Sequence, residues 1–276
     1  MRINKESAFR MSGTTLQKFA PEMRVSIPEG VTKIADFAFS GWHSIKSVVI
    51  PEGVTAIGVR AFEGCTSLRS IVLPTSLVTI GYGAFANCKS LRSIVIHDNV
   101  TSIGPCAFYG CDSMTSVIMS NNVTIIEDKI FAGCKNLRSV NIPDNATEIG
   151  SMAFQDCSSL RSIDIPASVT SIDCAVFAGC KSIKSIVVPN GVPKLEFSVF
   201  EGCLSLKSVS IPDSVRAIDM KAFKGCDSLK RLDIPANVQS CGSYPFGECP
   251  KFVVRVPKGS KTAAYFRSKA IAFKEF

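Results

Sequence analysis

The 276-residue sequence has few of the residues on which catalytic and metal sites depend. Its two histidines, His43 and His97, fall in loop positions, and no partner carboxylate or thiol is indicated for either. No two of its twelve cysteines have the C-x-x-C spacing typical of zinc or redox sites. Gly81-Tyr82-Gly83-Ala84-Phe85-Ala86 matches a dinucleotide fingerprint, but no βαβ unit surrounds it. The sequence therefore predicts no enzyme, no cofactor and no metal site.

Long hydrophobic runs are also missing. No stretch approaches the about 20 apolar residues that cross a bilayer, and the first residues contain no apolar run of signal-peptide length. We expect no membrane insertion. The expected location is cytoplasmic for the chain as written, and cell-surface or secreted if it is an excerpt of a longer protein. With 46% hydrophobic and 20% charged residues, disorder is excluded.

A 23-residue repeat fills most of the chain and recurs ten times. A hydrophobic residue followed by proline marks one repeat position, as in Ile27-Pro28 and Ile50-Pro51. A second position holds ten of the 18 phenylalanines, and no insertion or deletion interrupts the count until the last unit. These residues are Phe39, Phe62, Phe85, Phe108, Phe131, Phe154, Phe177, Phe200, Phe223 and Phe246.

Each unit contains the same three segments. L-x-S-I-x-I-P alternates β-branched residues and stops at proline, which predicts a short strand. V-T-x-I-G predicts a second, shorter strand or turn, and x-x-A-F-x-G-C predicts one helical turn closed by glycine. Because one unit is too small to bury its own face, neighbours must stack around a shared core. We expect Ile71, Ile94 and Ile163 in one continuous parallel sheet, with the phenylalanine column buried.

The period, AFxGC and LxSIxIP resemble the BspA-like (Treponema-type) leucine-rich repeat family over about residues 25 to 257. The resemblance implies an α/β solenoid, a leucine-rich-repeat horseshoe of ten repeats with its parallel sheet on the concave face. Members of that family are commonly surface or secreted proteins that bind host or neighbouring-cell proteins. The C-terminal VPKGSKTAAYFRSKAIAF resembles the capping segment of the family.

Three regions follow from this interpretation. Residues 1–26 are expected to form an N-terminal cap built on a strand pair, and residues 27–257 the solenoid. Residues 258–276 are expected to form a capping helix that begins after Ser260 as N-cap and carries Ala264, Phe266 and Ile271. Terminal closures of this kind keep a solenoid soluble.

Nine of the twelve cysteines occupy one repeat position, where the first unit has Trp42. Their spacing fits small buried hydrophobic residues that are inert while unexposed. Cys106, Cys174 and Cys241 lie off this column and receive no role. The column residues are Cys65, Cys88, Cys111, Cys134, Cys157, Cys180, Cys203, Cys226 and Cys249.

A basic column stands two residues before each strand isoleucine or valine. Without its eight cations the chain has 23 basic and 23 acidic residues, so this column accounts for the net charge of +8. Like charges about 5 Å apart repel by roughly 0.8 kcal/mol in water-like dielectric, a cost that the fold does not require. The row favours an acidic protein surface, an acidic glycan or a nucleic acid backbone as partner. The column runs Lys46, Arg69, Arg92, Thr115, Arg138, Arg161, Lys184, Lys207 and Lys230.

The alternative is a solvated by-product of the repeat, offset by acidic loop residues. The aromatic residues that single-stranded nucleic acid would require are missing from the column, which makes nucleic acid an unlikely partner. The acidic residues in question are Glu29, Glu52, Asp98, Asp144 and Asp213.

The column that follows each strand isoleucine varies along the chain. Its first four members, Val49, Val72, Val95 and Ile118, predict an exposed apolar strip beside the basic column, as interaction sites often have. β-Propensity alone is the alternative explanation. Farther on, the column becomes polar or acidic at most positions: Asn141, Asp164, Val187, Ser210 and Asp233.

These columns predict a non-catalytic protein–protein interaction module of adhesion or recognition type, which uses the concave sheet and its basic border. The alternative function is a binder of anionic polymers (glycosaminoglycan, acidic glycan or nucleic acid) along the Lys/Arg row. The expected partner is another protein, with an acidic surface if the cations contact it directly. The predicted partner-binding residues are Lys46, Val49, Arg69, Val72, Arg92, Val95, Ile118, Arg138 and Arg161.

Overall fold

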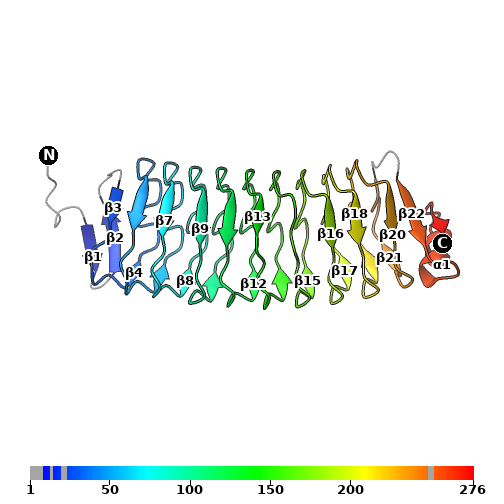
Figure 1. Ribbon diagram of the computed structural model, residues 1–276, viewed down its shortest axis with the longest axis horizontal. Coiled ribbons are helices and arrows are strands. Elements are labelled where there is room, and N and C mark those ends of the chain that lie inside the picture. The colour runs from blue at the N-terminus through cyan, green and yellow to red at the C-terminus, as the bar shows by residue number, and fades with distance from the viewer. Residues whose placement is uncertain (1–8, 13–14, 20–23, 248–251) are drawn as a thin grey trace.

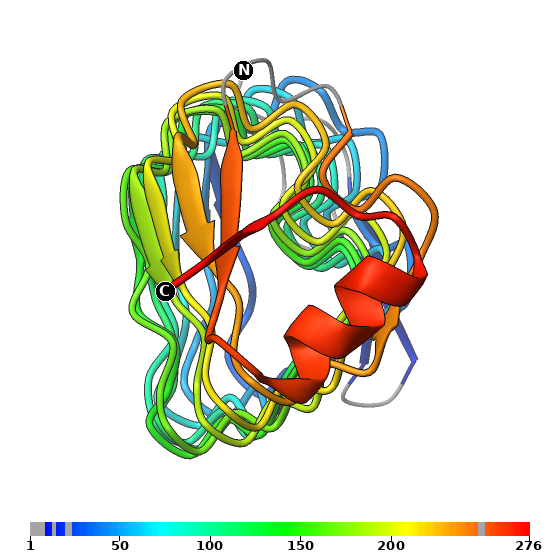
Figure 2. The same cartoon turned by 90° about the vertical axis from the view of Figure 1, so that its right-hand side faces the viewer.

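The computed structural model describes residues 9–12, 15–19, 24–247 and 252–276. The chain winds into a parallel β-solenoid of about eleven turns, and Figure 1 shows these coils side by side in one row. In the view along the row, successive coils superimpose around a common interior (Figure 2). The predicted fold class, a leucine-rich repeat solenoid, is confirmed.

Most coils contribute a long strand to one side of the solenoid, which we call the long-strand face. It corresponds to the predicted concave sheet, and neighbouring strands pair in parallel with a 23-residue offset, such as Val48 with Ile71. The long strands are β3 (Arg24–Ser26), β5 (Ser47–Val49), β7 (Ser70–Val72), β9 (Ser93–Val95), β11 (Ser116–Ile118), β13 (Ser139–Val140), β16 (Ser185–Val187), β18 (Ser208–Ser210), β20 (Arg231–Asp233) and β22 (Val253–Val256).

The V-T-x-I-G segments form a second column of parallel strands, two residues each, as predicted. Their isoleucines or leucines point inward, because the second residue of most of these strands is buried. The short strands are β4 (Lys33–Ile34), β6 (Ala56–Ile57), β8 (Thr79–Ile80), β10 (Ser102–Ile103), β12 (Ile125–Ile126), β14 (Glu148–Ile149), β15 (Ser171–Ile172), β17 (Lys194–Leu195), β19 (Ala217–Ile218) and β21 (Ser240–Cys241).

The long-strand face is not the single continuous sheet that the sequence predicts. β3, β5 and β7 form one sheet, β9, β11 and β13 another, and Ile163 lies in a coil without a long strand, although its side chain is buried. Asn141 supplies a physical reason for the early end of β13, because its side-chain Oδ1 accepts the Met119 N–H at 2.9 Å. At the equivalent place Ile96 donates to the backbone oxygen of Ile118. The amide therefore replaces a ladder bond just where β13 ends.

The x-x-A-F-x-G-C segment is a pair of turns, and the predicted helical turn is wrong. In the coil of Phe39, the N–H groups of Phe37, Phe39 and Gly41 donate to carbonyls of the next coil instead of forming a helix. Two backbone positions in this segment have positive φ, as at Arg60 (51°) and Gly64 (70°). Left-handed residues reverse the chain twice, which leaves alternate N–H groups facing the neighbouring coil.

The phenylalanine column forms the centre of the core. Nine rings, from Phe39 to Phe223, are fully buried, and neighbouring ring centroids lie 5.0 to 5.9 Å apart. Most pairs are stacked, with interplanar angles as small as 1°. The prediction of burial holds for these nine, whereas Phe246 is half-buried and contacts the rings of Phe252 and Phe266.

The cysteine column lies beside this stack, and its thiols do more than fill space. Each described thiol donates to the carbonyl oxygen of the phenylalanine 26 residues earlier, as from Cys65 Sγ to Phe39 at 3.1 Å and from Cys157 Sγ to Phe131 at 3.2 Å. Eight members of the column are buried, and Cys249 lies outside the described residues. Burial raises the pKa of the Cys65 and Cys203 thiols to about 12.

The column thiols are therefore expected to resist alkylation in the native protein. The thiolate is the reactive form, and both burial and a raised pKa suppress it. With iodoacetamide at pH 8, the half-buried Cys106 and Cys174 should be modified first, and peptides containing Cys88 to Cys226 only after denaturant is added. Mass spectrometry after timed quenching measures this. Rapid native labelling of Cys111 or Cys157 would contradict the packing.

The ends of the solenoid carry different elements. β1 (Phe9–Ser12) and β2 (Thr15–Phe19) form an antiparallel pair, and β2 continues the short-strand ladder beside β4. At the other end, Ser260 caps α1 (Lys261–Ser268) by accepting from the Ala263 N–H, and β23 (Lys274–Glu275) pairs with β22. The helix is shorter than predicted. It buries Thr262, Ala263 and Phe266, while Ala264 faces solvent and Ile271 lies beyond its end.

Candidate interaction surface

The long-strand face presents the predicted apolar strip to solvent. Val49, Val72, Val95 and Ile118 have exposed fractions of 58%, 73%, 59% and 56%. The alternation of the strands explains this, because the central residue of each strand packs inward and its neighbours must point outward. Val49 pairs with Val72 and Val95 with Ile118, so the strip consists of two hydrogen-bonded pairs on adjacent sheets.

The basic column runs along the amino-terminal edge of this strip, and we call it the basic border. Arg69, Arg92, Arg138 and Arg161 are exposed, and Lys46 is half-buried. Backbone hydrogen bonds hold consecutive members in adjacent coils: the Arg69 N–H donates to Lys46 and that of Arg138 to Thr115. Among the residues that the structure describes, those four arginines form no ion pair. Their charges are therefore directed to solvent and not to the acidic loops.

A shallow cavity of about 450 Å³ lies at the amino-terminal end of this surface. It brings together Lys46, Val49 and Arg69 from the predicted set, and adds Arg24, which the sequence analysis did not include. Arg24 pairs with Ser47 across the ladder, and Ser47 pairs with Ser70, so Arg24 stands where the next two coils have serine. Its distance of 23 residues from Ser47 was the sequence feature that could have identified it.

The carboxyl-terminal half of the face has the same cations but a different strip. Lys184, Lys207 and Lys230 are exposed, and Val187 is 66% exposed between polar neighbours. Asp233 contacts both Arg231 and Arg255 at 3.4 Å, so its carboxylate is neutralised within the face. A run of adjacent exposed apolar side chains with cations beside it is therefore confined to the first half.

The two histidines do not form a catalytic pair. His43 contacts the Gly64 carbonyl oxygen through Nδ1 at 2.8 Å, and His97 contacts the Pro74 carbonyl oxygen through Nε2. Across the described residues, no group of three or more His, Cys, Asp or Glu is placed to hold a metal ion. In the same part of the chain, no helix has both the length and the apolar character that a membrane crossing requires.

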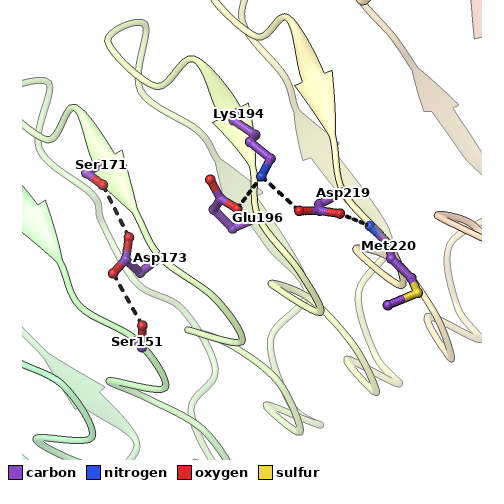
Figure 3. Close-up of polar contacts among 7 residues, drawn as sticks. All are labelled: Ser151, Ser171, Asp173, Lys194, Glu196, Asp219 and Met220. Atoms are coloured by element: carbon purple, nitrogen blue, oxygen red, sulfur yellow. Dashed lines mark hydrogen bonds and ion pairs between the residues drawn. The ribbon is translucent and has the colours of Figure 1, made fainter. Parts of the chain in front are cut away.

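A polar ladder at the ends of the short strands β15, β17 and β19 is a feature that the sequence analysis missed (Figure 3). Lys194 Nζ lies 2.7 Å from Glu196 Oε2 and 2.8 Å from Asp219 Oδ2, which links adjacent coils. The other oxygen of Asp219 accepts the Met220 N–H at 2.6 Å. The Lys194 hydrogen bond is the main reason that the pKa of Asp219 lies below its ordinary value.

Replacing Lys194 with methionine should cost less than about 1 kcal/mol, because the pair is partly exposed. A lowered pKa stabilises the fold above the unfolded pKa of Asp219, and this contribution disappears as pH falls through the folded value. The stability difference between wild type and Lys194→Met should therefore shrink as the pH falls below about 4, the usual pKa of an aspartate. Urea unfolding at several pH values measures this difference. A double-mutant cycle with Asp219→Asn isolates the contribution of the Lys194–Asp219 pair. A difference that stays constant to the lowest pH would contradict this account.

The geometry defines a class: a parallel β-solenoid of leucine-rich repeats with a solvent-facing strand surface. A model of the BspA type leucine rich repeat region matches residues 32–161, 101–230 and 147–266. The chain therefore belongs to the BspA-type leucine-rich repeat family.

Solved structures are consistent with this assignment. The chain is similar to a leucine rich cell surface protein from Faecalibacterium prausnitzii A2-165, with 26% identity, a TM-score of 0.52 and 96% of this chain and 95% of that chain covered. Two further structures show the same fold: a leucine-rich repeat protein from Bacteroides ovatus ATCC 8483 (23%, TM-score 0.54, 97% and 97%) and the pneumococcal vaccine antigen PcpA (18%, TM-score 0.52, 94% and 82%). No curated protein matches the chain. These relatives are repeat proteins of a scaffold family typical of interaction and surface recognition modules.

Proposed function

We propose that this protein is a non-catalytic recognition module that binds another protein across the amino-terminal half of its long-strand face. The observation that carries the proposal is the run of four apolar side chains, each more than half exposed, beside Arg69 and Arg92, which are exposed and form no ion pair among the described residues. A partner would gain desolvation energy from the strip, while the basic border would guide its approach and fix its register. The similarity to a cell surface protein supports a role in adhesion or recognition.

A photo-crosslinking experiment tests the location of the surface. A photoreactive amino acid at position 72 is compared with the same substitution at position 187, because both valines are exposed at equivalent strand positions. The proposal expects one protein to be crosslinked from position 72 and little from position 187, and the same protein to bind when purified. Equal crosslinking from both positions, or none from position 72, would contradict the amino-terminal location.

The second candidate function, binding of an anionic polymer, rests on the continuation of exposed cations to Lys230. Salt separates the two functions. Polyanion binding releases counterions, so affinity for heparin would fall by orders of magnitude between 50 and 200 mM salt if six or more cations take part. A protein partner held largely by the apolar strip would lose much less.

A further inference from the structure

A groove along the x-x-A-F-x-G-C turns belongs to no part of the proposed function. Two adjoining cavities of about 340 and 440 Å³ share Asn87 and Tyr109, and together they cross the turns of successive coils. We call them the turn-face groove. None of the predicted partner-binding residues lines it.

Two tyrosines stand in this groove. Tyr82 and Tyr109 line the smaller cavity and are 41% and 43% exposed. The Arg60 guanidinium lies 5.4 Å from the centroid of the Tyr82 ring, which fixes the ring by a cation–π contact. Exposed aromatic rings with one fixed face provide a flat apolar platform beside a polar hydroxyl.

Amide and carboxylate side chains cross the larger cavity. Asn87 and Asp156 occupy a turn position where most coils have glycine, with φ of 58° and 57°, and both line this cavity. A Cβ on Gly110 would lie 2.6 Å from Asn87 Oδ1, so the amide lies directly over the next coil. Asp156 lies over Gly179 in the same way. The turns thus hold hydrogen-bonding groups across the groove.

The charges that line the groove are only partly paired. Arg60 contacts Glu63 and Lys135 contacts Asp112, both at 3.7 Å. Lys89, Lys181 and Asp156 also line the larger cavity, and Lys129 lines the smaller one. The groove therefore presents charges of both signs, whereas the exposed arginines of the basic border form no ion pair in the described part of the chain.

We propose that the turn-face groove binds an oligosaccharide. The C–H face of a sugar ring packs against an aromatic ring, while its hydroxyl groups both donate and accept hydrogen bonds. Tyr82 and Tyr109 supply the first interaction, and Asn87, Asp156 and Lys89 supply donors and acceptors for the second. The groove combines polar groups with these two rings and lacks the large apolar pocket that anchors a typical peptide or drug-like ligand.

Saturation-transfer NMR and calorimetry with four defined probes test the proposal: cellotetraose, maltotetraose, chitotetraose and tetragalacturonate. At least one neutral tetrasaccharide should bind, and Tyr109→Ala and Tyr82→Ala should each weaken binding about tenfold or more, as expected for an aromatic anchor. Tyr244→Ala is the matched control, because Tyr244 is 81% exposed and lines neither cavity. Raising the salt to 0.5 M should change the affinity for a neutral tetrasaccharide less than about twofold, since that ligand carries no charge.

Three results would overturn the proposal. One is absence of binding for all four probes at millimolar concentration. Another is binding that Tyr82→Ala and Tyr109→Ala leave unchanged while both variants remain folded. The third is binding of tetragalacturonate alone that Arg69→Glu abolishes, which would assign the sugar to the basic border. Because Arg69 lies outside the groove, this control also separates the fate of this proposal from that of the protein-binding surface.

Discussion

Phe131→Ala should lower the free energy of unfolding by about 3–5 kcal/mol, the range for removing a large buried aromatic side chain. The Phe131 ring is fully buried, and its centroid lies 5.6 Å from those of both Phe108 and Phe154. The substitution opens a cavity at the centre of the stack, which neighbouring coils cannot fill without breaking their own ladder. Thermal and urea denaturation followed by circular dichroism measures the loss.

The effect should also be local in its first stage. Each coil contacts only its neighbours, so stability is close to a sum of coil and interface contributions. Hydrogen exchange should show lost protection in the coils of Phe108, Phe131 and Phe154 before the terminal coils change. Ile125→Ala is the control, since Ile125 is 40% exposed in β12 and surface changes usually fall within about 0.5 kcal/mol. Equal losses for both variants would show that the stack is not the principal stabilising feature.

The fold could be predicted from the sequence largely because the repeat multiplies each weak local pattern. One L-x-S-I-x-I-P segment is ambiguous, but its recurrence fixes the strand column, and the phenylalanine column fixes the core. The turn conformation could not be predicted in the same way. Arg60, Lys129 and Met152 have positive φ without being glycine, because inter-coil hydrogen bonds impose a conformation that their local sequence does not favour.

The division of the long-strand sheet shows a second limit. Asn141 could be placed on the outer face from the repeat alone, and it is exposed there. The Asn141 side chain also replaces a backbone oxygen as the acceptor of the Met119 N–H. That contact depends on the side-chain rotamer and on a distance, and neither can be obtained from the repeat pattern of the sequence. The turn-face groove was missed for a related reason. Tyr82 and Tyr109 stand in different repeat columns, and only the packing of adjacent coils brings them into one cavity.

For the interaction surface, the sequence predicted which side chains point outward but not which cations are neutralised. The period places Arg69, Lys207 and Arg231 on the same side of the solenoid. The structure separates them, because Arg231 contacts Asp233 whereas Arg69 and Lys207 form no ion pair in the described part of the chain.

Val72→Asp and Arg69→Glu should each weaken binding of the crosslinked partner by tenfold or more, which corresponds to at least about 1.4 kcal/mol. Val72 is the most exposed member of the strip at 73%, so a carboxylate there would be buried against the partner without compensation. Arg69→Glu reverses a charge in the 450 Å³ cavity and should reduce the association rate, with a loss that diminishes in high salt. Because both side chains are exposed, the melting temperature should change little.

Val187→Asp and Lys207→Glu are the matched variants, since they make the same changes at exposed, equivalent positions in the carboxyl-terminal half. They should leave the affinity within about threefold of wild type, as expected for substitutions outside a localised contact. If this pair weakens binding as much as the first, the ligand contacts the whole basic border, and an anionic polymer becomes the better assignment. If neither pair changes the affinity, the partner does not bind on the long-strand face. Surface plasmon resonance at 50 and 300 mM salt distinguishes these outcomes, because only a ligand that spans many cations would show a steep loss of affinity with salt in addition to equal sensitivity at both ends.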